Sequence, residues 1–403
     1  MLDRWNPPSA ASEPPLADCV RAARCVGAEP ELAIAGGGNT SVKIDGDAGT
    51  ILWVKGSGTD LARVSADDYA PLDLAAIEKL LCDPALDNTR MRDALRTALR
   101  APAAPRPSIE TLMHAALPWP HVIHTHAAPI LALCNTAQAE AIVSAALGRN
   151  VLQVPYRHSG ASLAAACREA LARYADAQPA GLVLMRHGLV TWGGTAREAY
   201  AATLALCARA DAYLDARGAT RPAAGDLVDA EPDAAARNLV EQLRADAAEI
   251  AGRPLAGVVR NSRFMRDFAG RRDVAAITAQ GPSTPGHTLL TRAWPQVGRD
   301  CAAYASAYRE HLCGIGDFDH APRVILDPAF GALILGVDAA HAEAAATVFV
   351  NDAIVMARAA AIDRYRGPGA AWLRLAEVEY SGAAPEAIAR AAALAGATET
   401  AQA

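Results

Sequence analysis

Apolar residues recur at helical spacing in several stretches of the first half of the chain. Helices are therefore expected over 16–29, 72–81 and 88–100, within 129–147 and over 195–216. Apolar runs of strand length beside glycine-rich turns predict strands in "NTSVKI", "ILWVK", "HVIHTH" and on both sides of the turn in "GLVLMRHGLVTWG". A further helix is expected behind "RPS", where Ser108 is a candidate cap.

The second half shows a similar alternation after an interruption. Residues 217–235 are rich in glycine, proline and acidic residues, which is typical of a linker. Beyond them the pattern predicts a helix over 236–251, a strand in "LAGVVR", a short helix, a strand in "VAAITA", the loop "QGPSTPGH", a helix over 300–313, strands in "RVILD" and "ALILGV", and a helix over 339–365.

The alternation of strands and helices predicts an α/β (α+β) fold. A length of 403 residues suits two domains. We expect a mobile leader over 1–15, a catalytic domain over 16–216, the linker over 217–235 and a smaller α/β domain over 236–403.

Composition excludes some classes of function. A net charge of −6 disfavours nucleic acid as a partner, although a local basic pocket for a small anion remains compatible with it. The alanine-rich stretch near 340–365 is interrupted by Asn351, Asp352 and Arg358, so no membrane span is expected. The N-terminus lacks a signal-peptide pattern, and the eight cysteines form no C-x-x-C pair. A cytoplasmic protein with reduced thiols is expected.

Three histidines stand where a metal site would need them. His124 and His126 lie two positions apart in "HVIHTH", so in a strand they share one face with Cα atoms about 6.5 Å apart. That spacing lets two imidazoles bind one ion at about 2.0–2.1 Å, but a strand with polar residues on one face gives the same pattern. His187 lies in a tight turn before Gly188, after the run "LVLM", and would face a cleft. Three protein ligands and an open position are typical of a catalytic metal site.

Glu110 is the candidate carboxylate, in the first turn of the helix behind "RPS". A helix dipole alone also favours a glutamate at that place. His114 lies four residues further on the same helix face, where it either orients Glu110 or packs.

Two glycine-rich loops are candidate anion sites. "GGGNTS" (36–41) and "KGSG" (55–58) each lie beside a strand, and backbone N–H groups in such loops bind oxyanions. Ser108, Lys43 and Lys55 can add donors. Neither loop has the spacing of a P-loop, and "GGGNTS" lacks the G-x-G-x-x-G spacing.

The motifs "GGGNTS", "KGSG", "RPSIET" with His114, "HTH" and "RHGLVTWG" stand in an order and spacing that resemble the class II aldolases of the aldolase/adducin family. The resemblance covers about 20–215 and extends more weakly over 255–380. It is nearest to the aldolase part of the long enzymes that join rhamnulose-1-phosphate aldolase to a short-chain dehydrogenase. The dehydrogenase part is expected to be absent from this chain.

The resemblance implies a three-layer sheet-and-helix domain, and it implies roles for residues. His124, His126 and His187 match zinc ligands, with Mn²⁺ or Co²⁺ as other possible ions, and Glu110 matches the catalytic acid/base. The positions that match the phosphate-binding loops are Gly38, Asn39, Ser41, Ser57, Gly58 and Ser108. Many family members have a second serine before the glutamate, where this chain has Ile109, as the fused enzymes do.

The implied reaction is cleavage of a ketose 1-phosphate of the rhamnulose or fuculose type into dihydroxyacetone phosphate and an aldehyde. A divalent ion offsets the charge that develops next to the carbonyl, and a carboxylate of raised pKa moves protons. The implied partners are a small sugar phosphate and further copies of the chain, most simply in a tetramer.

Other functions fit parts of the same pattern. A sugar-phosphate 4-epimerase or a decarboxylase would use the same metal site. A Schiff-base aldolase would use a lysine, of which the chain has Lys43, Lys55 and Lys79. An adducin-like scaffold would keep the fold without the metal.

The loop 280–292 is a candidate for substrate selection. If it follows a strand, it lies where ligands commonly bind in α/β units. His287 and Arg292 are its polar groups that could reach a hydroxylated or anionic substrate. An exposed loop without a role in binding is the alternative.

Overall fold

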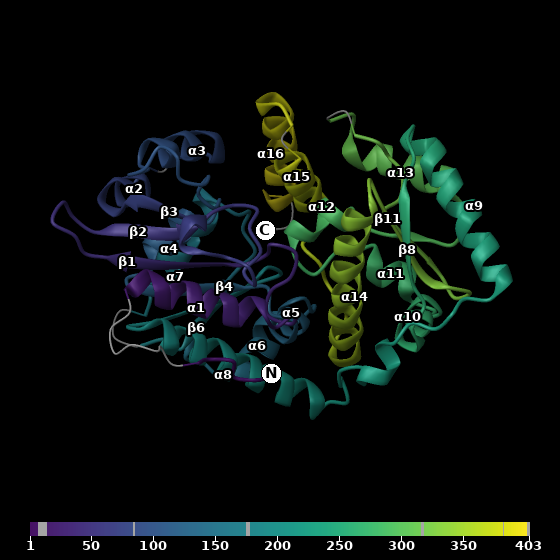
Figure 1. Ribbon diagram of the computed structural model, residues 1–403, viewed down its shortest axis with the longest axis horizontal. Coiled ribbons are helices and arrows are strands. Elements are labelled where there is room, and N and C mark those ends of the chain that lie inside the picture. The colour runs from purple at the N-terminus through teal and green to yellow at the C-terminus, as the bar shows by residue number, and fades with distance from the viewer. Residues whose placement is uncertain (7–13, 84, 175–177, 316–317, 382, 401–403) are drawn as a thin grey trace. The chain divides into compact units, whose positions relative to one another are not determined.

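The computed structural model describes residues 1–6, 14–83, 85–174, 178–315, 318–381 and 383–400 (Figure 1). The chain divides into two compact units. The first consists of Met1–Cys134 and Gln138–Tyr213, and the second of Asn135–Ala137 and Leu214–Ala403. The predicted leader falls partly on 7–13, which lie outside the described residues.

The first unit is built on a seven-stranded sheet in the order β3-β2-β1-β4-β7-β6-β5. Neighbouring strands run antiparallel except β5 and β6, which are parallel. The strands are β1 (Asn39–Ile44), β2 (Ile51–Lys55), β3 (Tyr69–Asp73), β4 (His121–Thr125), β5 (Val151–Val154), β6 (Gly181–Leu184) and β7 (Gly188–Gly193).

Helices cover both faces of this sheet and complete the three layers that the family resemblance implies. Val122 and Val190 point into one core, which is shared with α2 (Leu74–Leu80), α3 (Asn88–Thr97), α4 (Thr111–Ala116) and α7 (Ala161–Ala172). The neighbouring Thr191 points to the opposite face and bonds to Thr203 of α8. That face carries α1 (Pro15–Gly27), α5 (Ala128–Cys134), α6 (Ala139–Leu147) and α8 (Ala196–Asp215).

Capping residues set the helix boundaries in this unit. Asp73 accepts a hydrogen bond from the Ala76 N–H and so starts α2, two residues later than predicted. The residues before it form β3, which the sequence pattern did not reveal. Asp87 starts α3 in the same way, through the Arg90 N–H. Strand β5 and helix α7 were also not predicted.

The second unit has a four-stranded sheet in the order β8-β11-β10-β9. The strands are β8 (Ala256–Arg260), β9 (Gln296–Val297), β10 (Val324–Asp327) and β11 (Gly331–Gly336). The long helix α14 (Ala339–Ile362) packs on β8 and β11. The remaining helices are α9 (Ala234–Ala251), α10 (Arg263–Ala269), α11 (Val274–Thr278), α12 (Thr288–Thr291), α13 (Cys301–Leu312), α15 (Ala370–Tyr380) and α16 (Pro385–Thr400).

Helix α14 is, among the described residues, the one helix long and apolar enough to cross a membrane. Its apolar window is 56% buried inside the chain, and Asp352 and Arg358 are themselves buried within the helix. Its apolar residues therefore form the core of the second unit.

The prediction of a strand in "VAAITA" is wrong, because these residues form α11. Val274, Ile277 and Thr278 are buried at i, i+3 and i+4, which is helical spacing, and Thr278 Oγ1 donates to the Val274 carbonyl. A short apolar run cannot be assigned by periodicity alone. The loop 280–292 therefore follows a helix, and it contains a short 3₁₀ turn and α12.

Candidate metal centre

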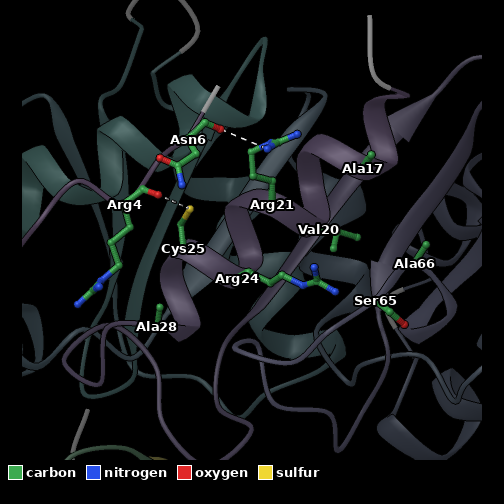
Figure 2. A pocket seen from close by; sticks show the side chains of 10 residues that line it. All are labelled: Arg4, Asn6, Ala17, Val20, Arg21, Arg24, Cys25, Ala28, Ser65 and Ala66. Atoms are coloured by element: carbon green, nitrogen blue, oxygen red, sulfur yellow. Dashed lines mark hydrogen bonds between the residues drawn. The ribbon is translucent and has the colours of Figure 1, made fainter. Parts of the chain in front are cut away.

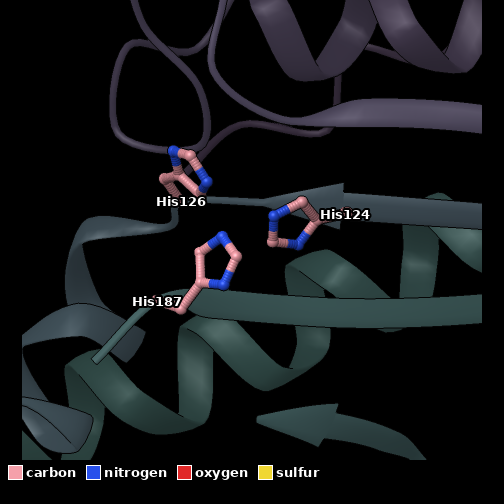
Figure 3. A group of neighbouring side chains, drawn as sticks. All are labelled: His124, His126 and His187. Atoms are coloured by element: carbon pink, nitrogen blue, oxygen red, sulfur yellow. The ribbon is translucent and has the colours of Figure 1, made fainter. Parts of the chain in front are cut away.

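The three predicted histidines converge in the first unit (Figure 3). His124 lies in β4, His126 just beyond its end, and His187 in the turn between β6 and β7. One ligand nitrogen from each ring lies within 4.8 Å of the other two. His124 is fully buried and His187 is 4% exposed, so the cluster lies inside the unit.

Two glycines permit this convergence. Gly188 begins β7, and a Cβ there would lie 2.3 Å from the Thr125 carbonyl and 2.9 Å from His124 Cε1. Gly38, at φ +74°, precedes β1, and a Cβ there would lie 2.7 Å from the His124 carbonyl. Only glycine lets both chain segments approach β4 this closely.

The imidazoles have the chemistry that a divalent ion requires. His124 Nδ1 lies 3.1 Å from the Leu189 carbonyl, which only accepts, so Nδ1 carries the proton and Nε2 offers its lone pair. Nε2 is buried and has no hydrogen-bond partner, and the same holds for His187 Nδ1. Buried nitrogens without partners are costly, and an ion bound by the three rings would satisfy them.

Glu110 lies against two of the histidines. It is the residue before α4, at the position that caps the helix, rather than in the first turn as predicted. Its Oε1 lies 3.1 Å from His187 Nε2, and its Oε2 lies 3.5 Å from His124 Nε2. An ion held by the three histidines would therefore lie beside this carboxylate.

The neighbours of Glu110 set the pKa of its carboxyl. Burial alone would raise the pKa of this carboxyl, but nearby His124, the hydrogen bond from His187 and that from Asn39 hold the pKa well below its usual range. This direction holds without a bound ion, so the raised pKa expected of the carboxylate beside a divalent ion stays a prediction. Glu110 is ionised at neutral pH and can accept a proton.

A chain of hydrogen bonds connects Glu110, through Asn39, to His114 and Ser41. Asn39 Nδ2 donates to Glu110 Oε2 at 2.7 Å, and Asn39 Oδ1 is bonded to His114 Nε2. The other ring nitrogen, Nδ1, lies 2.7 Å from Ser41 Oγ. Burial lowers the pKa of His114 to about 3, so the ring is neutral.

These contacts fix the direction of every bond. The Asn39 Oδ1 can only accept, so His114 Nε2 donates to it and Nδ1 accepts from the Ser41 hydroxyl. The Asn39 amide is held with its nitrogen toward Glu110. His114 therefore orients Glu110 through Asn39, which is the first of the two roles considered from the sequence.

The residues predicted to bind phosphate do not all lie at the site. Asn39 Nδ2 lies 3.3 Å from Ser108 Oγ, and Ser108 Oγ also accepts from the Glu110 N–H, so these two residues lie at the site. Ser57 and Gly58 lie on an exposed loop. Ser41 is fully buried and bonded to His114, so the expectation that it contacts phosphate is wrong. Ser41 lies in β1, two residues beyond Asn39, and its hydroxyl contacts His114 of α4.

Lys43 is a structural residue. Its Nζ donates to the carbonyls of His114, Leu117 and Trp119, at the end of α4. All three ammonium protons have partners, so no donor is left for a substrate. Of the two roles expected for Lys43, substrate contact or support of the site, the contacts with α4 and His114 fit only support.

Ser159 is a site residue that the sequence analysis missed. Its hydroxyl donates to Glu110 Oε1 at 3.3 Å, and the side chain is 5% exposed. Gly160, at φ +112°, follows it and begins α7. The pair Ser-Gly before a helical pattern was the one available signal.

The second unit holds His287 and Arg292 in place. Both side chains are under 9% exposed. Arg292 donates to Glu377 Oε1 at 2.7 Å and to Asp319 Oδ1 at 2.9 Å, and His287 Nδ1 lies 2.9 Å from Asp352 Oδ1. Arg292 is thus a buried ion-pair residue, which corrects the expected substrate contact. A role for His287 in aldehyde selection stays a prediction.

A separate hollow of about 570 Å³ lies in the first unit, over α1 (Figure 2). Its basic lining residues are Arg4, Arg21 and Arg24. Arg4 pairs with Glu29 and Arg21 with Asp18, so carboxylates offset part of the positive charge. None of its lining residues belongs to the candidate metal centre.

Comparison with known families agrees with this geometry. Residues 17–214 match the family described as "Class II Aldolase and Adducin N-terminal domain", and residues 234–380 match "Aldolase class II, second domain". The chain belongs to the class II aldolase superfamily. The first match contains every residue of the candidate metal centre.

Individual relatives match about half of the length of this class II aldolase-family chain. "Uncharacterized oxidoreductase YuxG" of Bacillus subtilis is 35% identical over 220 residues, which are 53% of this chain and 32% of YuxG. The chain thus matches about a third of the length of that relative.

Two solved structures illustrate the range of similarity. The N-terminal class II aldolase domain of a conserved protein from Thermoplasma acidophilum is 32% identical, with a TM-score of 0.48 over 53% of this chain and 99% of that one. The L-fuculose-1-phosphate aldolase from Thermus thermophilus is 19% identical, with a TM-score of 0.35 over 52% and 97%.

Proposed function

We propose that this protein is a metal-dependent aldolase that cleaves a ketose 1-phosphate into dihydroxyacetone phosphate and an aldehyde. The observation that carries the proposal is the position of Glu110, whose two carboxylate oxygens lie 3.1 Å and 3.5 Å from nitrogens of two converged histidines. A base beside an open metal site is what a retro-aldol reaction needs.

The three imidazoles would hold the ion, most simply Zn²⁺, with Mn²⁺ or Co²⁺ as other candidates. A bound divalent ion supplies a Lewis acid that stabilises negative charge developing on a carbonyl oxygen when the adjacent carbon–carbon bond breaks. Neutral histidine nitrogens are ligands that these ions accept.

Glu110 is the group that moves the proton. In cleavage, the substrate hydroxyl loses a proton, the carbon–carbon bond breaks, and the carbon that keeps the electron pair gains a proton. An ionised Glu110 can accept the first proton and return it to that carbon. Asn39 and Ser159 hold one carboxylate oxygen each, so the carboxylate keeps its orientation during the transfer.

The test is a screen of 1-phosphoketoses with the purified full chain, after its metal content is measured. Release of dihydroxyacetone phosphate that stops with a chelator and returns with zinc supports the proposal. Substrate trapped by borohydride would instead identify a Schiff-base aldolase, and a 4-epimer formed without free aldehyde would identify an epimerase. Release of CO₂ from a sugar acid would identify a decarboxylase.

His114 is expected to act through Asn39. The substitution His114→Phe removes both ring hydrogen bonds at similar volume, so the Asn39 amide can turn its oxygen toward the Glu110 carboxylate. We expect kcat to fall by roughly 100-fold, because small misplacements of a catalytic group have effects of that order. Metal content should stay unchanged.

The control for His114 is Ser41→Ala, which removes only the outer bond and should have a much smaller effect on kcat. The pH dependence of kcat separates the two possible roles, since a merely structural residue would not move it. If His114→Phe kept the kcat and pH profile of the unmodified chain, the orienting role would be excluded.

An oligomer, most simply a tetramer, is proposed from the superfamily, in which oligomers are common. Light scattering at micromolar concentration should give a mass that is a multiple of the 41.9 kDa chain. A monomer across that concentration range would contradict the proposal.

We also propose that this chain is related to enzymes that join an aldolase to a dehydrogenase. The match to YuxG, which is described as an oxidoreductase and is matched over only 32% of its length, supports it. A cytoplasmic location remains part of the proposal as well.

A further inference from the structure

Ser159 reaches Glu110 from the turn between β5 and α7. Gly160 stands at the position that would cap α7, but it has no side chain to bond to the free N–H groups at the start of this helix. The Ser159 hydroxyl lies 3.3 Å from Glu110 Oε1, at the long end of the range for such a hydrogen bond. A small shift of the turn would therefore break this contact.

Asn88, which belongs to another helix, bonds to this turn on both sides of Gly160. It is the first residue of α3, and its Nδ2 donates to the Ser159 carbonyl at 2.8 Å. Its Oδ1 accepts from the Ala161 N–H at 3.2 Å. One amide thus supplies the bond that Gly160 cannot, and it also holds the residue whose hydroxyl contacts Glu110.

Gly160 leaves room for the Asn88 amide. A Cβ at Gly160 would lie 2.0 Å from Asn88 Oδ1 and 2.9 Å from Asn88 Nδ2. The backbone at Gly160 has φ +112° and ψ −139°, a combination that strains any other residue. The turn is therefore shaped so that the amide can lie directly against its backbone.

The core of the first unit keeps Asn88 in place. Met91 and Leu95 follow it at i+3 and i+7, on the same side of α3. Both side chains are buried in the core that α3 shares with α4 and α7. The position of the amide is therefore set by the packing of the whole helix, and not by the turn that it contacts.

We propose that Asn88 is a positioning residue, which holds Ser159 where its hydroxyl donates to Glu110. The carboxylate is then fixed from two sides, by Asn39 of β1 at Oε2 and by Ser159 at Oε1. Asn88 acts through Ser159 rather than on the substrate. The inference rests on the proposed function for the role of Glu110, and it adds α3 to the elements on which the geometry of the site depends.

Amide hydrogen exchange of the full chain tests this role without any need for activity. Asn88→Ala should raise the exchange rate over 156–164 by roughly 10-fold, because the Ala161 N–H loses its acceptor and the turn opens more often. Thr89→Ala, at the next and exposed residue of α3, is the matched control. It should leave exchange in this segment unchanged.

Asn88→Asp separates the two hydrogen bonds of the amide. A carboxylate can still accept from the Ala161 N–H, but it cannot donate to the Ser159 carbonyl. Exchange at the start of α7 should therefore stay slow while kcat falls. Full kcat in this variant would show that the bond to the Ser159 carbonyl does not position the hydroxyl, and the inference would be overturned.

The kinetic test compares Asn88→Ala, Ser159→Ala and the double variant with the unmodified chain. Each single substitution should lower kcat by roughly 10-fold, the order expected when a charged group loses one hydrogen bond, while KM and metal content change little. The double variant should match Ser159→Ala within roughly 2-fold, because Asn88 acts through Ser159. A residue that only stabilised the fold would lower kcat independently of Ser159.

The outcomes separate this inference from the proposed function. Unchanged exchange in Asn88→Ala, or effects on kcat that multiply in the double variant, would overturn the role of Asn88 even if the protein cleaves ketose 1-phosphates. Raised exchange in Asn88→Ala, in a protein that cleaves no ketose 1-phosphate, would support the hold of Asn88 on Ser159 and overturn the proposed function instead.

Discussion

Alanine at His187 is expected to remove tightly bound divalent metal from the purified protein, and with it all turnover. The ring provides one of three converging ligands, and the remaining two cannot enclose an ion. Even indirect partners of metal ligands change affinity by roughly 10–100-fold, so loss of a direct ligand should weaken binding by roughly 100-fold or more. Elemental analysis of the dialysed protein measures this result.

His121 is the matched control for that experiment. It lies in β4 with His124 and is also buried, but it is not one of the three clustered histidines. His121→Ala should therefore keep the metal, whatever it does to stability. Full metal occupancy in His187→Ala would show that the ion is held elsewhere, and the proposed reaction would lose its Lewis acid.

The convergence of the three histidines could be predicted because its signals are local. His124 and His126 share a strand face whatever the rest of the chain does, and the turn at His187 is marked by Gly188. The order of the motifs indicated the family, and the fold of that family implied that these residues lie in one sheet. The convergence of these three histidines was therefore predicted correctly, and the ion that they would hold stays a prediction.

The hydrogen bonds that hold Glu110, through Asn39 and His114, could not be predicted from local sequence. Asn39 lies beside His124 because β1 pairs with β4 in one register, and a shift by one residue would turn Asn39 to the other face. The bond to His114 depends in addition on how α4 packs on that face. The roles of Ser41 and Lys43 in holding α4 follow from these long-range contacts.

The second unit shows a different limit. The run "VAAITA" is too short for apolar spacing to separate strand from helix, and the incorrect choice also placed the next loop at a strand end. The charge of Arg292 indicated a substrate contact, but this side chain forms ion pairs with Glu377 and Asp319 inside the unit. Their positions, 85 and 27 residues away, carried no sequence signal.

Replacing Glu110 with glutamine should separate metal binding from catalysis. The amide has nearly the same volume, and the three histidines are untouched, so the metal should remain. The side chain can no longer accept a proton, and kcat should fall by roughly 100- to 10,000-fold, the usual contribution of a general acid or base. Single-turnover measurement of aldehyde release, on protein of known metal content, tests this.

The direction of the Glu110 pKa shift sharpens the expectation. Burial raises the pKa of this carboxyl, but nearby His124 and His187 lower it by more. Without a bound ion, Glu110 therefore remains a base down to acidic pH. Glutamine in its place leaves no titrating group there, and the acidic limb of the kcat profile should disappear along with most of the rate. Glu140→Gln, at an exposed glutamate, should leave both unchanged. If Glu110→Gln retained near-normal kcat with full metal content, Glu110 would serve only to begin α4, and proton transfer would have to be assigned to another group.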